Sequence, residues 1–374
     1  MAGIYIHIPF CRKACHYCNF HFSTSLHLHN ELVNALLLEI ELKQSYLTEA
    51  VSTVYFGGGT PSILPWTQLD RILQKIYSVF ILEAGAEITL EANPDDISLM
   101  KLDELKAIGI NRLSIGVQSF FEEDLTWMNR AHNAKQANDC ISLSKQAGFD
   151  NISIDLIYGT PTLSDERWQE NVQKAIDMNI SHLSCYALTV EPKTALEKMI
   201  AQNKVVNVDM DRQAHHFEML MQQLGDAGYE HYEISNFSKP GKRSRHNSNY
   251  WKGKPYLGIG PSAHSFNGDS RQWNVSNNAL YIQSLLKGII PYEIETLTID
   301  QQLNEYIMTS LRTLEGLSLE KIRKDFGEQN AAQLLRSANT YIALNLLKNQ
   351  HGFLQTTNEG KLRADGIAAD LFTV

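Results

Sequence analysis

The segment YIHIPFCRKACHYCNF, residues 5–20, joins an apolar run to three cysteines in the spacing C-x3-C-x2-C. Residues 4–8 are mostly β-branched or aromatic, which favours a β-strand. Cys11, Cys15 and Cys18 follow at once, so a single loop carries all three thiols. Because the chemistry of parallel barrels gathers at the carboxyl ends of their strands, this segment predicts a first strand with a site at its end.

Further apolar runs continue the pattern along the first half of the chain. Strands are expected at residues 53–56, 87–90, 112–117, 151–157 and 182–188, and helices at 30–46, 67–80, 99–108, 134–147 and 164–178. Strands that alternate with helices predict parallel βα units with right-handed crossovers. We therefore expect an α/β fold, namely a partial (β/α)6 TIM-like barrel.

Polar motifs stand at the end of nearly every expected strand. They are Gly57-Gly58-Gly59-Thr60-Pro61, Glu91-Ala92-Asn93-Pro94, Gln118, Asp155 with Tyr158-Gly159-Thr160-Pro161, and Tyr186-Ala187. Glycines after a strand allow backbone N–H and C=O groups to approach a ligand closely. The motifs therefore predict one ligand-binding mouth built from six segments.

The rhythm changes after about residue 205. A helix is expected at 210–227, a loop-rich stretch at 238–278, and helices at 301–314, 318–326, 328–347 and from 358 onward. We expect three parts: a barrel with the cysteine site at 1–235, a loop-rich extension at 236–297, and a mainly helical, winged-helix-like domain at 298–374. The sequence of the last part shows no basic face of the kind that binds DNA. We therefore expect this part to dock onto the barrel or to cover it.

Composition excludes several classes of protein. The formal net charge of -9 argues against a surface that wraps nucleic acid. No segment approaches the roughly 20 apolar residues that span a bilayer, and five cysteines form no disulfide framework in a chain of 374 residues. Cys140 and Cys185 are expected in the core. We expect a cytosolic protein, which would meet the membrane surface transiently if its partner is a membrane enzyme.

Three thiolates suit a [4Fe-4S] cluster that keeps one iron open to another ligand, because such a cluster normally takes four cysteines. S-adenosylmethionine (SAM) can occupy that iron and undergo reductive cleavage to start radical chemistry. A structural zinc site with His16 or His21 as fourth ligand is the alternative, since Cys3His is a common zinc set. The glycine motif that ends the second strand favours the cluster.

These motifs resemble the radical SAM superfamily. Within it they resemble the branch that contains oxygen-independent coproporphyrinogen III oxidase (dehydrogenase) and the heme chaperone HemW family. The likeness covers essentially the whole chain, and it includes residues 5–11, 114–120, 129–130 and 155–159 besides the motifs above. It implies that SAM contacts Tyr5, Tyr17, Gly58, Gly59, Thr60, Glu91, Gln118, Arg130, Asp155 and Ala187.

The implied contacts match the chemical groups of SAM. Arg130 suits the SAM carboxylate through charge-assisted hydrogen bonds, and Glu91 suits the ammonium or sulfonium region. Gln118 and Asp155 suit ribose hydroxyls. Tyr5 and Tyr17 would flank SAM and the cluster.

Three features favour the chaperone over the oxidase. Phe20 stands where the oxidase has a further cysteine, and only ten residues precede Cys11, where the oxidase has a long extension. The segment RHNSNYW, residues 245–251, matches the H-N-x-x-Y-W string of the chaperone family. The resemblance implies heme binding there, with His246 as a candidate iron ligand and Tyr250 and Trp251 packing on the porphyrin.

We therefore expect a heme chaperone that holds a [4Fe-4S] cluster, SAM and heme. It would pass heme to an acceptor such as a respiratory enzyme and take electrons from a flavodoxin or ferredoxin. The alternative is the oxidase activity, in which propionates of coproporphyrinogen III are oxidatively decarboxylated to vinyl groups.

Overall fold

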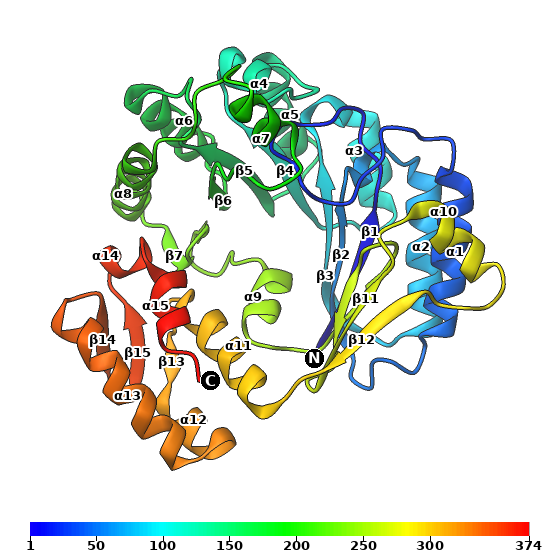
Figure 1. Ribbon diagram of the computed structural model, residues 1–374. Coiled ribbons are helices and arrows are strands. Elements are labelled where there is room, and N and C mark those ends of the chain that lie inside the picture. Colours follow the sequence, from blue (N-terminus) through cyan, green and yellow to red (C-terminus); the bar gives the residue numbers. More distant parts are fainter. Residues whose placement is uncertain (374) are drawn as a thin grey trace.

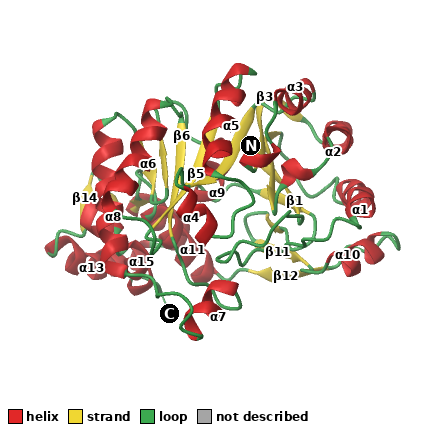
Figure 2. Cartoon of the chain, turned by 90° about the horizontal axis from the view of Figure 1, so that it is seen from above, coloured by secondary structure: helices red, strands yellow, loops and turns green. Residues whose placement is uncertain are grey.

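The computed structural model describes residues 1–373 and shows a long curved sheet with helices along its outside (Figures 1 and 2). The sheet has twelve strands in the order β12-β11-β10-β9-β1-β2-β3-β4-β5-β6-β8-β7. Its six central strands are β1 Ala2–Ile8, β2 Val51–Gly58, β3 Leu82–Ala92, β4 Arg112–Gln118, β5 Ile152–Tyr158 and β6 His182–Ala187. All neighbouring pairs among them are parallel, which confirms the predicted βα barrel.

Helices cover the outer face of these strands. Each follows its strand in sequence, and the main ones are α1 His29–Leu42, α2 Trp66–Val79, α3 Leu99–Ala107, α5 Ala134–Gln146 and α6 Asp165–Asp177. Leu36 of α1, Leu69 of α2 and Val172 of α6 are fully buried in the same core as the strand residues. The outer face of the sheet is therefore the main core, and the inner face is left for polar side chains.

The inner face is visible in the burial pattern of single strands. In β1 and β5 every side chain is buried except one, Tyr5 and Asp155 respectively. A parallel strand covered on one face only by helices shows this pattern when its inward residues border a hollow. The two side chains that remain accessible are both predicted cofactor contacts.

The barrel does not close within the described residues, because the sheet ends at β12 (Tyr292–Thr296) and at β7 (Glu230–Glu233). At one end β8 (Asn236–Ser238) and β7 run antiparallel to each other, and β8 is antiparallel to β6. At the other end β9 (Tyr256–Ile259) pairs in parallel with β1, so that Ile4 lies opposite Leu257. The partial barrel of the prediction is therefore confirmed.

The stretch expected to be loop-rich is more ordered than its sequence indicates. It contains α9 Arg245–Trp251, β9, β10 His264–Phe266 and β11 Ser270–Asn274. These strands are too short to show a period of their own. Pairing with the edge of β1 stabilises β9, and β10 and β11 follow it in the sheet. A buried carboxylate fixes the extension to α1, because Glu39 accepts hydrogen bonds from Gly260 N at 2.8 Å and Asn274 Nδ2 at 2.7 Å.

The C-terminal part has a core of its own, separate from that of the barrel. Its elements are α11 Ile299–Leu311, β13 Leu317–Ser318, α12 Leu319–Phe326, α13 Glu328–Ala343, β14 Leu347–Gln350, β15 Phe353–Thr356, α14 Asn358–Lys361 and α15 Ala364–Asp370. The small sheet has the order β13-β15-β14 and lies beside the helices, as the mainly helical, winged-helix-like prediction requires. The helix expected at 328–347 ends earlier because Leu347 begins β14.

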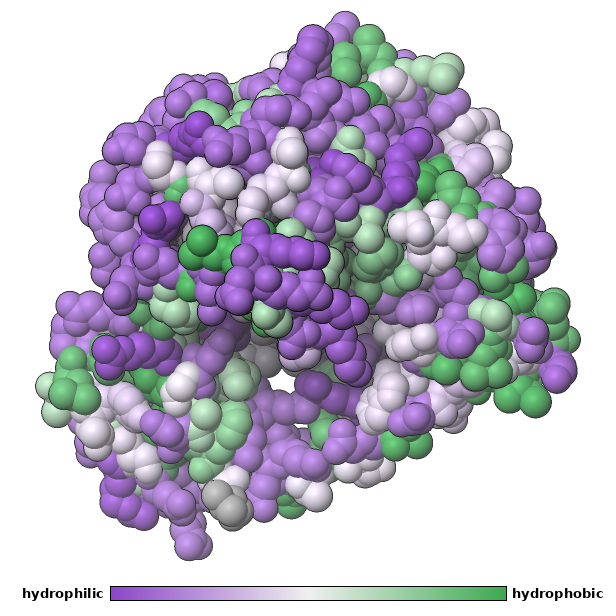
Figure 3. Space-filling view, turned by 45° about the horizontal axis from the view of Figure 1, so that its top comes forward, coloured by the Kyte–Doolittle hydropathy of each residue, from purple (hydrophilic) through white to green (hydrophobic). Residues whose placement is uncertain are grey.

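The barrel and the C-terminal part leave a hollow between them. Figure 3 shows this hollow near the centre of the molecule, with hydrophilic residues over most of the surrounding surface. The ribbon shows the same arrangement, since the C-terminal elements lie across from the open side of the curved sheet (Figure 1). The inner face of the barrel therefore stays reachable for a ligand.

Several short elements were not predicted. They are the 3-10 helices Pro61–Ile63 and Pro94–Asp96, and the helices α4 Glu122–Trp127, α7 Ala195–Ala201 and α10 Asn278–Leu285. The expected helix at 210–227 is present as α8 Met210–Asp226. Across residues 1–373, no helix combines the length and the apolar composition that crossing a bilayer requires.

Candidate functional site

The cysteine loop lies over the carboxyl ends of the barrel strands. Cys11 begins it, donating its backbone N–H to Ser23 O at 3.0 Å, and Cys18 N donates to Cys15 O at 3.3 Å. The thiol of Cys11 accepts a hydrogen bond from Thr60 Oγ1 at 3.6 Å. Burial raises the pKa of Cys11 to about 11, so this thiol is neutral near pH 7 unless a metal ion replaces its proton.

The two histidines of the zinc alternative each have a hydrogen-bond partner elsewhere. His16 has its Nδ1 2.8 Å from Trp127 O, and His21 has its Nε2 2.7 Å from Asn278 Oδ1. Three partly exposed thiols on one loop suit a cluster, whose irons are spread over several ångströms, better than a single ion.

Arg130 connects the cysteine loop to the barrel. Its Nη1 donates to Cys15 Sγ at 3.2 Å and to Tyr17 Oη at 3.4 Å. Its Nη2 donates to Asn93 Oδ1 at 2.8 Å and to Gly116 O at 3.0 Å. The buried Nε has no partner within residues 1–373. One guanidinium thus reaches the cysteine loop and the ends of β3 and β4, and it places a positive charge beside the loop.

The glycine motif forms a close wall beside the cysteines. A Cβ on Gly59 would lie 2.6 Å from Phe10 O and 3.0 Å from Cys11 Sγ. Gly58 has φ +109°, and a Cβ there would lie 2.6 Å from the His7 ring. Only glycine fits these two positions, because the backbone itself approaches the cysteine loop. Thr60 then directs its hydroxyl toward the Cys11 thiol.

Two carboxylates lie in the hollow beneath the loop. Glu91 accepts hydrogen bonds from Tyr55 Oη at 2.8 Å and from Gly58 N at 3.2 Å. Burial raises the pKa of Glu91 to about 7, and the nearby charge of Asp155 adds to the shift. Burial likewise raises the pKa of Asp155 to about 6. Both side chains keep some accessible surface, so they border the hollow and a bound cation would favour their charged forms.

Gln118 carries local strain at the end of β4. Its φ is +59°, a left-handed conformation that is uncommon for residues other than glycine. Its buried Oε1 has no partner in the described structure, and a bulge interrupts the pairing with β5 just before it. Strained backbone and an unpaired acceptor at one mouth position are typical of a ligand site. Ala187, at the end of β6, lies opposite Tyr158 of β5.

His246 lies within the hollow, on the inner side of α9. Its Nδ1 is 2.9 Å from Thr53 Oγ1, and its ring stacks on Tyr55 with centroids 4.9 Å apart. Tyr5 is a further neighbour at 6.5 Å. Burial and the charge of Arg112 lower the pKa of His246 to about 4. The structure thus groups His246 with the predicted SAM residues, whereas Tyr250 and Trp251 line a different cleft.

Sequence reasoning assigned no individual role to four polar or aromatic residues of the barrel's inner face: Tyr55, Asn93, Arg112 and Tyr186. Tyr55 could have been found, because it lies opposite Tyr5 across β1 and β2. Asn93 and Tyr186 belong to the strand-end motifs, so their place in those motifs was the signal that could have identified them. Arg112 is 1% exposed, and its Nε and Nη2 have no hydrogen-bond partner within residues 1–373. Its position at the start of a strand gives no sequence signal of this kind.

Comparison with known proteins identifies relatives along the whole chain. Residues 5–175 match the model of the radical SAM superfamily, and residues 297–363 match the HemN C-terminal domain. The chain is 34% identical to heme chaperone HemW of Mycobacterium tuberculosis over 99% of this chain and 94% of the relative. It is 33% identical to heme chaperone HemW of Bacillus subtilis over 97% of both.

A solved structure shows the same architecture. Coproporphyrinogen III oxidase (HemN) from Escherichia coli, described as a radical SAM enzyme, superposes with a TM-score of 0.85 at 25% identity. The match covers 100% of this chain and 90% of the oxidase chain. Both parts of the fold, the open barrel and the C-terminal domain, are therefore shared with that structure.

Proposed function

Since the chain belongs to the heme chaperone HemW family of radical SAM proteins, we propose that it binds heme and passes it to an acceptor protein. Membership in the radical SAM superfamily implies a [4Fe-4S] cluster and SAM. We assign the cluster to Cys11, Cys15 and Cys18 and SAM to the hollow beneath them. The observation that carries this assignment is Arg130, whose guanidinium connects Cys15 to the ends of two barrel strands.

The residues of the mouth would hold SAM by complementary charge and hydrogen bonding. Arg130 would bind the carboxylate, and ionised Glu91 would bind the ammonium group or lie near the sulfonium. Gln118 and Asp155 would accept hydrogen bonds from ribose hydroxyls. Tyr5 and Tyr17 would pack against the ligand, and Gly58, Gly59, Thr60 and Ala187 would allow its close approach. When bound, the cluster and SAM together supply one-electron reductive chemistry.

The proposal extends to partners and to the parts of the chain. Residues 1–235 would carry the cluster and SAM, residues 236–297 would attach the H-N-x-x-Y-W segment to the barrel, and residues 298–374 would cover it. A respiratory enzyme would accept the heme in the cytosol or at the membrane surface, and a flavodoxin or ferredoxin would donate electrons. Heme transfer requires no decarboxylation.

Anaerobic reconstitution followed by heme titration tests the proposal. We expect iron and sulfide in near-equal amounts, saturable heme binding, and transfer of the bound heme to an acceptor on mixing. Stoichiometric zinc without sulfide would exclude the cluster. Reconstituted protein that binds no heme would exclude the chaperone function.

The second candidate is coproporphyrinogen III oxidase activity, which the whole-chain structural likeness to the Escherichia coli oxidase favours. Both functions would use the same residues of the mouth, so these residues do not distinguish a chaperone from an oxidase. Phe20 is 69% exposed on the rim at the position where the oxidase carries a further cysteine. We expect no conversion of coproporphyrinogen III by the reduced protein with SAM, and conversion would reverse the ranking of the two functions.

A further inference from the structure

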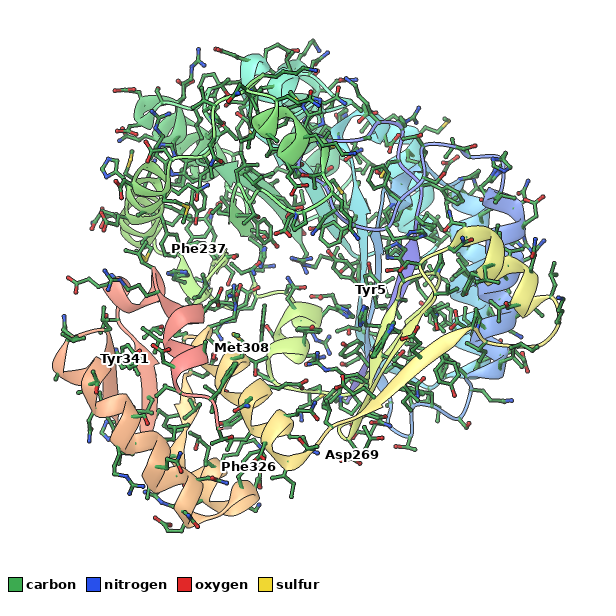
Figure 4. The ribbon with its side chains drawn as sticks, in the orientation of Figure 1. Tyr5, Phe237, Asp269, Met308, Phe326 and Tyr341 are labelled. Atoms are coloured by element: carbon green, nitrogen blue, oxygen red, sulfur yellow. The ribbon has the colours of Figure 1, made fainter. Side chains whose placement is uncertain are left out.

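A second hollow lies outside the mouth, between the extension and the C-terminal part. It has a volume of about 600 Å³, within the range of about 300–1,000 Å³ that is usual for sites of organic ligands. One wall comes from α9 and from β9 to β12, and the other comes from α11, α12 and Phe372. Figure 4 shows the second wall, with Met308 on α11 and Phe326 at the end of α12. We call this hollow the interdomain cleft.

The first wall of the interdomain cleft is a continuous row of aromatic rings. Trp251 meets Tyr250 edge-on at 5.5 Å between centroids. Tyr250 meets Tyr256 at 5.4 Å, and Tyr256 meets Phe266 at 6.3 Å. Tyr250 is 44% exposed, although a large aromatic side chain gains from burial. We call these four residues the aromatic row; its neighbouring rings are inclined by 88°, 41° and 38°, so a flat ligand would meet some of them by the face and others by the edge.

The opposite wall is also rich in large apolar side chains. Tyr306, Met308, Phe326 and Phe372 line it, and all four are only partly buried in the C-terminal core. Both walls are therefore incompletely covered in the structure. A ligand between them would remove aromatic surface from water on both of its faces, which is the main source of affinity for a flat ring system.

A cation stands at one end of the aromatic row. The Arg271 guanidinium lies 5.9 Å from the centre of the Phe266 ring. Its Nη2 pairs with Glu305 at 2.9 Å, and Glu295 lines the cleft as well. Lys252 follows Trp251, so it lines the cleft at the opposite end of the row. An amphipathic ligand with a carboxylate at the Phe266 end would find a charged donor in Arg271.

We propose that the interdomain cleft is the heme site, and this inference rests on the proposed chaperone function. The porphyrin lies against the aromatic row, and a propionate reaches Arg271 at the Phe266 end of the row. His246 does not face this cleft, since its ring stacks on Tyr55 in the barrel hollow. In this arrangement the residues of the H-N-x-x-Y-W segment have two roles. His246 anchors α9 to the barrel, and Tyr250 and Trp251 contact the ligand.

Heme titration of the cluster-loaded full chain tests the site with three variants. Tyr250→Ala removes an exposed ring of the aromatic row, Arg271→Gln removes the cation, and Thr309→Trp fills the cleft from α11. We expect about tenfold weaker heme binding for each of the first two and loss of saturable binding for the third. Tyr77→Ala is the matched control, because Tyr77 is 43% exposed on α2, a helix that does not line the cleft.

The outcomes distinguish a wrong heme site from a wrong chaperone function. The cluster absorbance and the thermal unfolding midpoint of every variant show whether it is folded, and SAM affinity should stay unchanged because the mouth is intact. Wild-type protein that binds no heme removes the proposed function itself. Heme binding that survives all three cleft variants overturns the inference and leaves the function standing, and its loss on His246→Ala would then move heme into the barrel hollow.

Discussion

The barrel mouth and the interdomain cleft are both lined by tyrosines and arginines, yet their polar atoms are used differently. In the mouth, Arg130 and Glu91 are tied to fixed partners on several strands, and burial shifts the pKa of Glu91 to about 7. In the cleft the rings form an open row with Arg271 at one end. The first arrangement suits a small, charged ligand held by directed hydrogen bonds, and the second suits a large, flat one held by contact area. On the two proposals above, SAM and heme would occupy separate sites and would not compete.

The largest effect is expected from removing a thiol of the cysteine loop. Cys15→Ala should abolish the cluster, so that reconstituted protein holds almost no iron or sulfide instead of about four of each. Metal analysis and visible absorbance measure this. Cys140→Ala is the control, because Cys140 is 1% exposed in the barrel core. A Cys15 variant that keeps a full cluster would place the cluster elsewhere.

Arg130→Gln should weaken SAM binding by about 10- to 100-fold, since a charge-assisted hydrogen bond contributes about 1.5–3 kcal/mol. Isothermal titration of the reconstituted protein measures the affinity. Heme affinity should change little, because the aromatic row does not contact Arg130. Arg71→Gln, an exposed change on α2, serves as control. Equal losses of SAM and heme would mean that the two sites are one.

The pH dependence of SAM binding should follow Glu91. Its pKa of about 7 lies above the ordinary 4.5 because of burial, so the carboxylate is mostly protonated at pH 6 and mostly charged at pH 8. A cationic ligand prefers the charged form, and SAM affinity should be about tenfold weaker at pH 6 than at pH 8. Glu91→Gln should bind weakly at both values. A wild-type protein whose SAM affinity is flat with pH would remove Glu91 from contact with the cation.

The same shift affects the free protein. Between pH 4.5 and 7 the folded chain holds a proton on Glu91 that the unfolded chain has released. This group therefore contributes stability at low pH that is lost as the pH rises through 7. In scanning calorimetry, Glu91→Gln should flatten that fall, whereas Glu83→Gln on the outer end of β3 should leave it unchanged.

The smallest effect is expected from His246→Ala, which tests the boundary between the two regions. Loss of its contacts with Thr53 and Tyr55 should weaken SAM binding about threefold. Heme binding should remain within about twofold of wild type, because α9 keeps its cap from Glu87 to the N–H groups of Arg245 and His246. His27→Ala, on an exposed loop, is the control. A heme loss much larger than the SAM loss would contradict the division of the H-N-x-x-Y-W segment.

The mouth was predictable from sequence, and the cleft was not. Each mouth motif stands directly after an apolar run, so the spacing of the motifs alone brings side chains such as Glu91 and Gln118 together. The aromatic row joins Tyr250, Tyr256 and Phe266 through strands too short to show alternation. Its opposite wall folds about its own core. Tertiary pairing, which local patterns do not encode, creates that cleft.

Two residues of the barrel's inner face were missed for a related reason. Tyr55 and Arg112 point inward because of strand register, and a shift of one position would turn both into core-facing residues. The sequence marks the ends of the strands more clearly than their inward faces. His246 was assigned by resemblance to a heme site, and the structure groups it with Tyr5 and Tyr55 instead, so its role in iron ligation stays a prediction.

Because β1 pairs with β9, one edge of β1 stays unpaired for much of synthesis on the ribosome. β1 precedes the cysteine loop, yet its second edge meets β9 only about 250 residues later in the chain. At about 5–20 residues per second, the nascent barrel waits on the order of 10–50 s with that edge unpaired. The cysteine loop is therefore made long before the strand that covers the second edge of β1. Until β9 has been made, that edge presents unpaired backbone groups to any other chain.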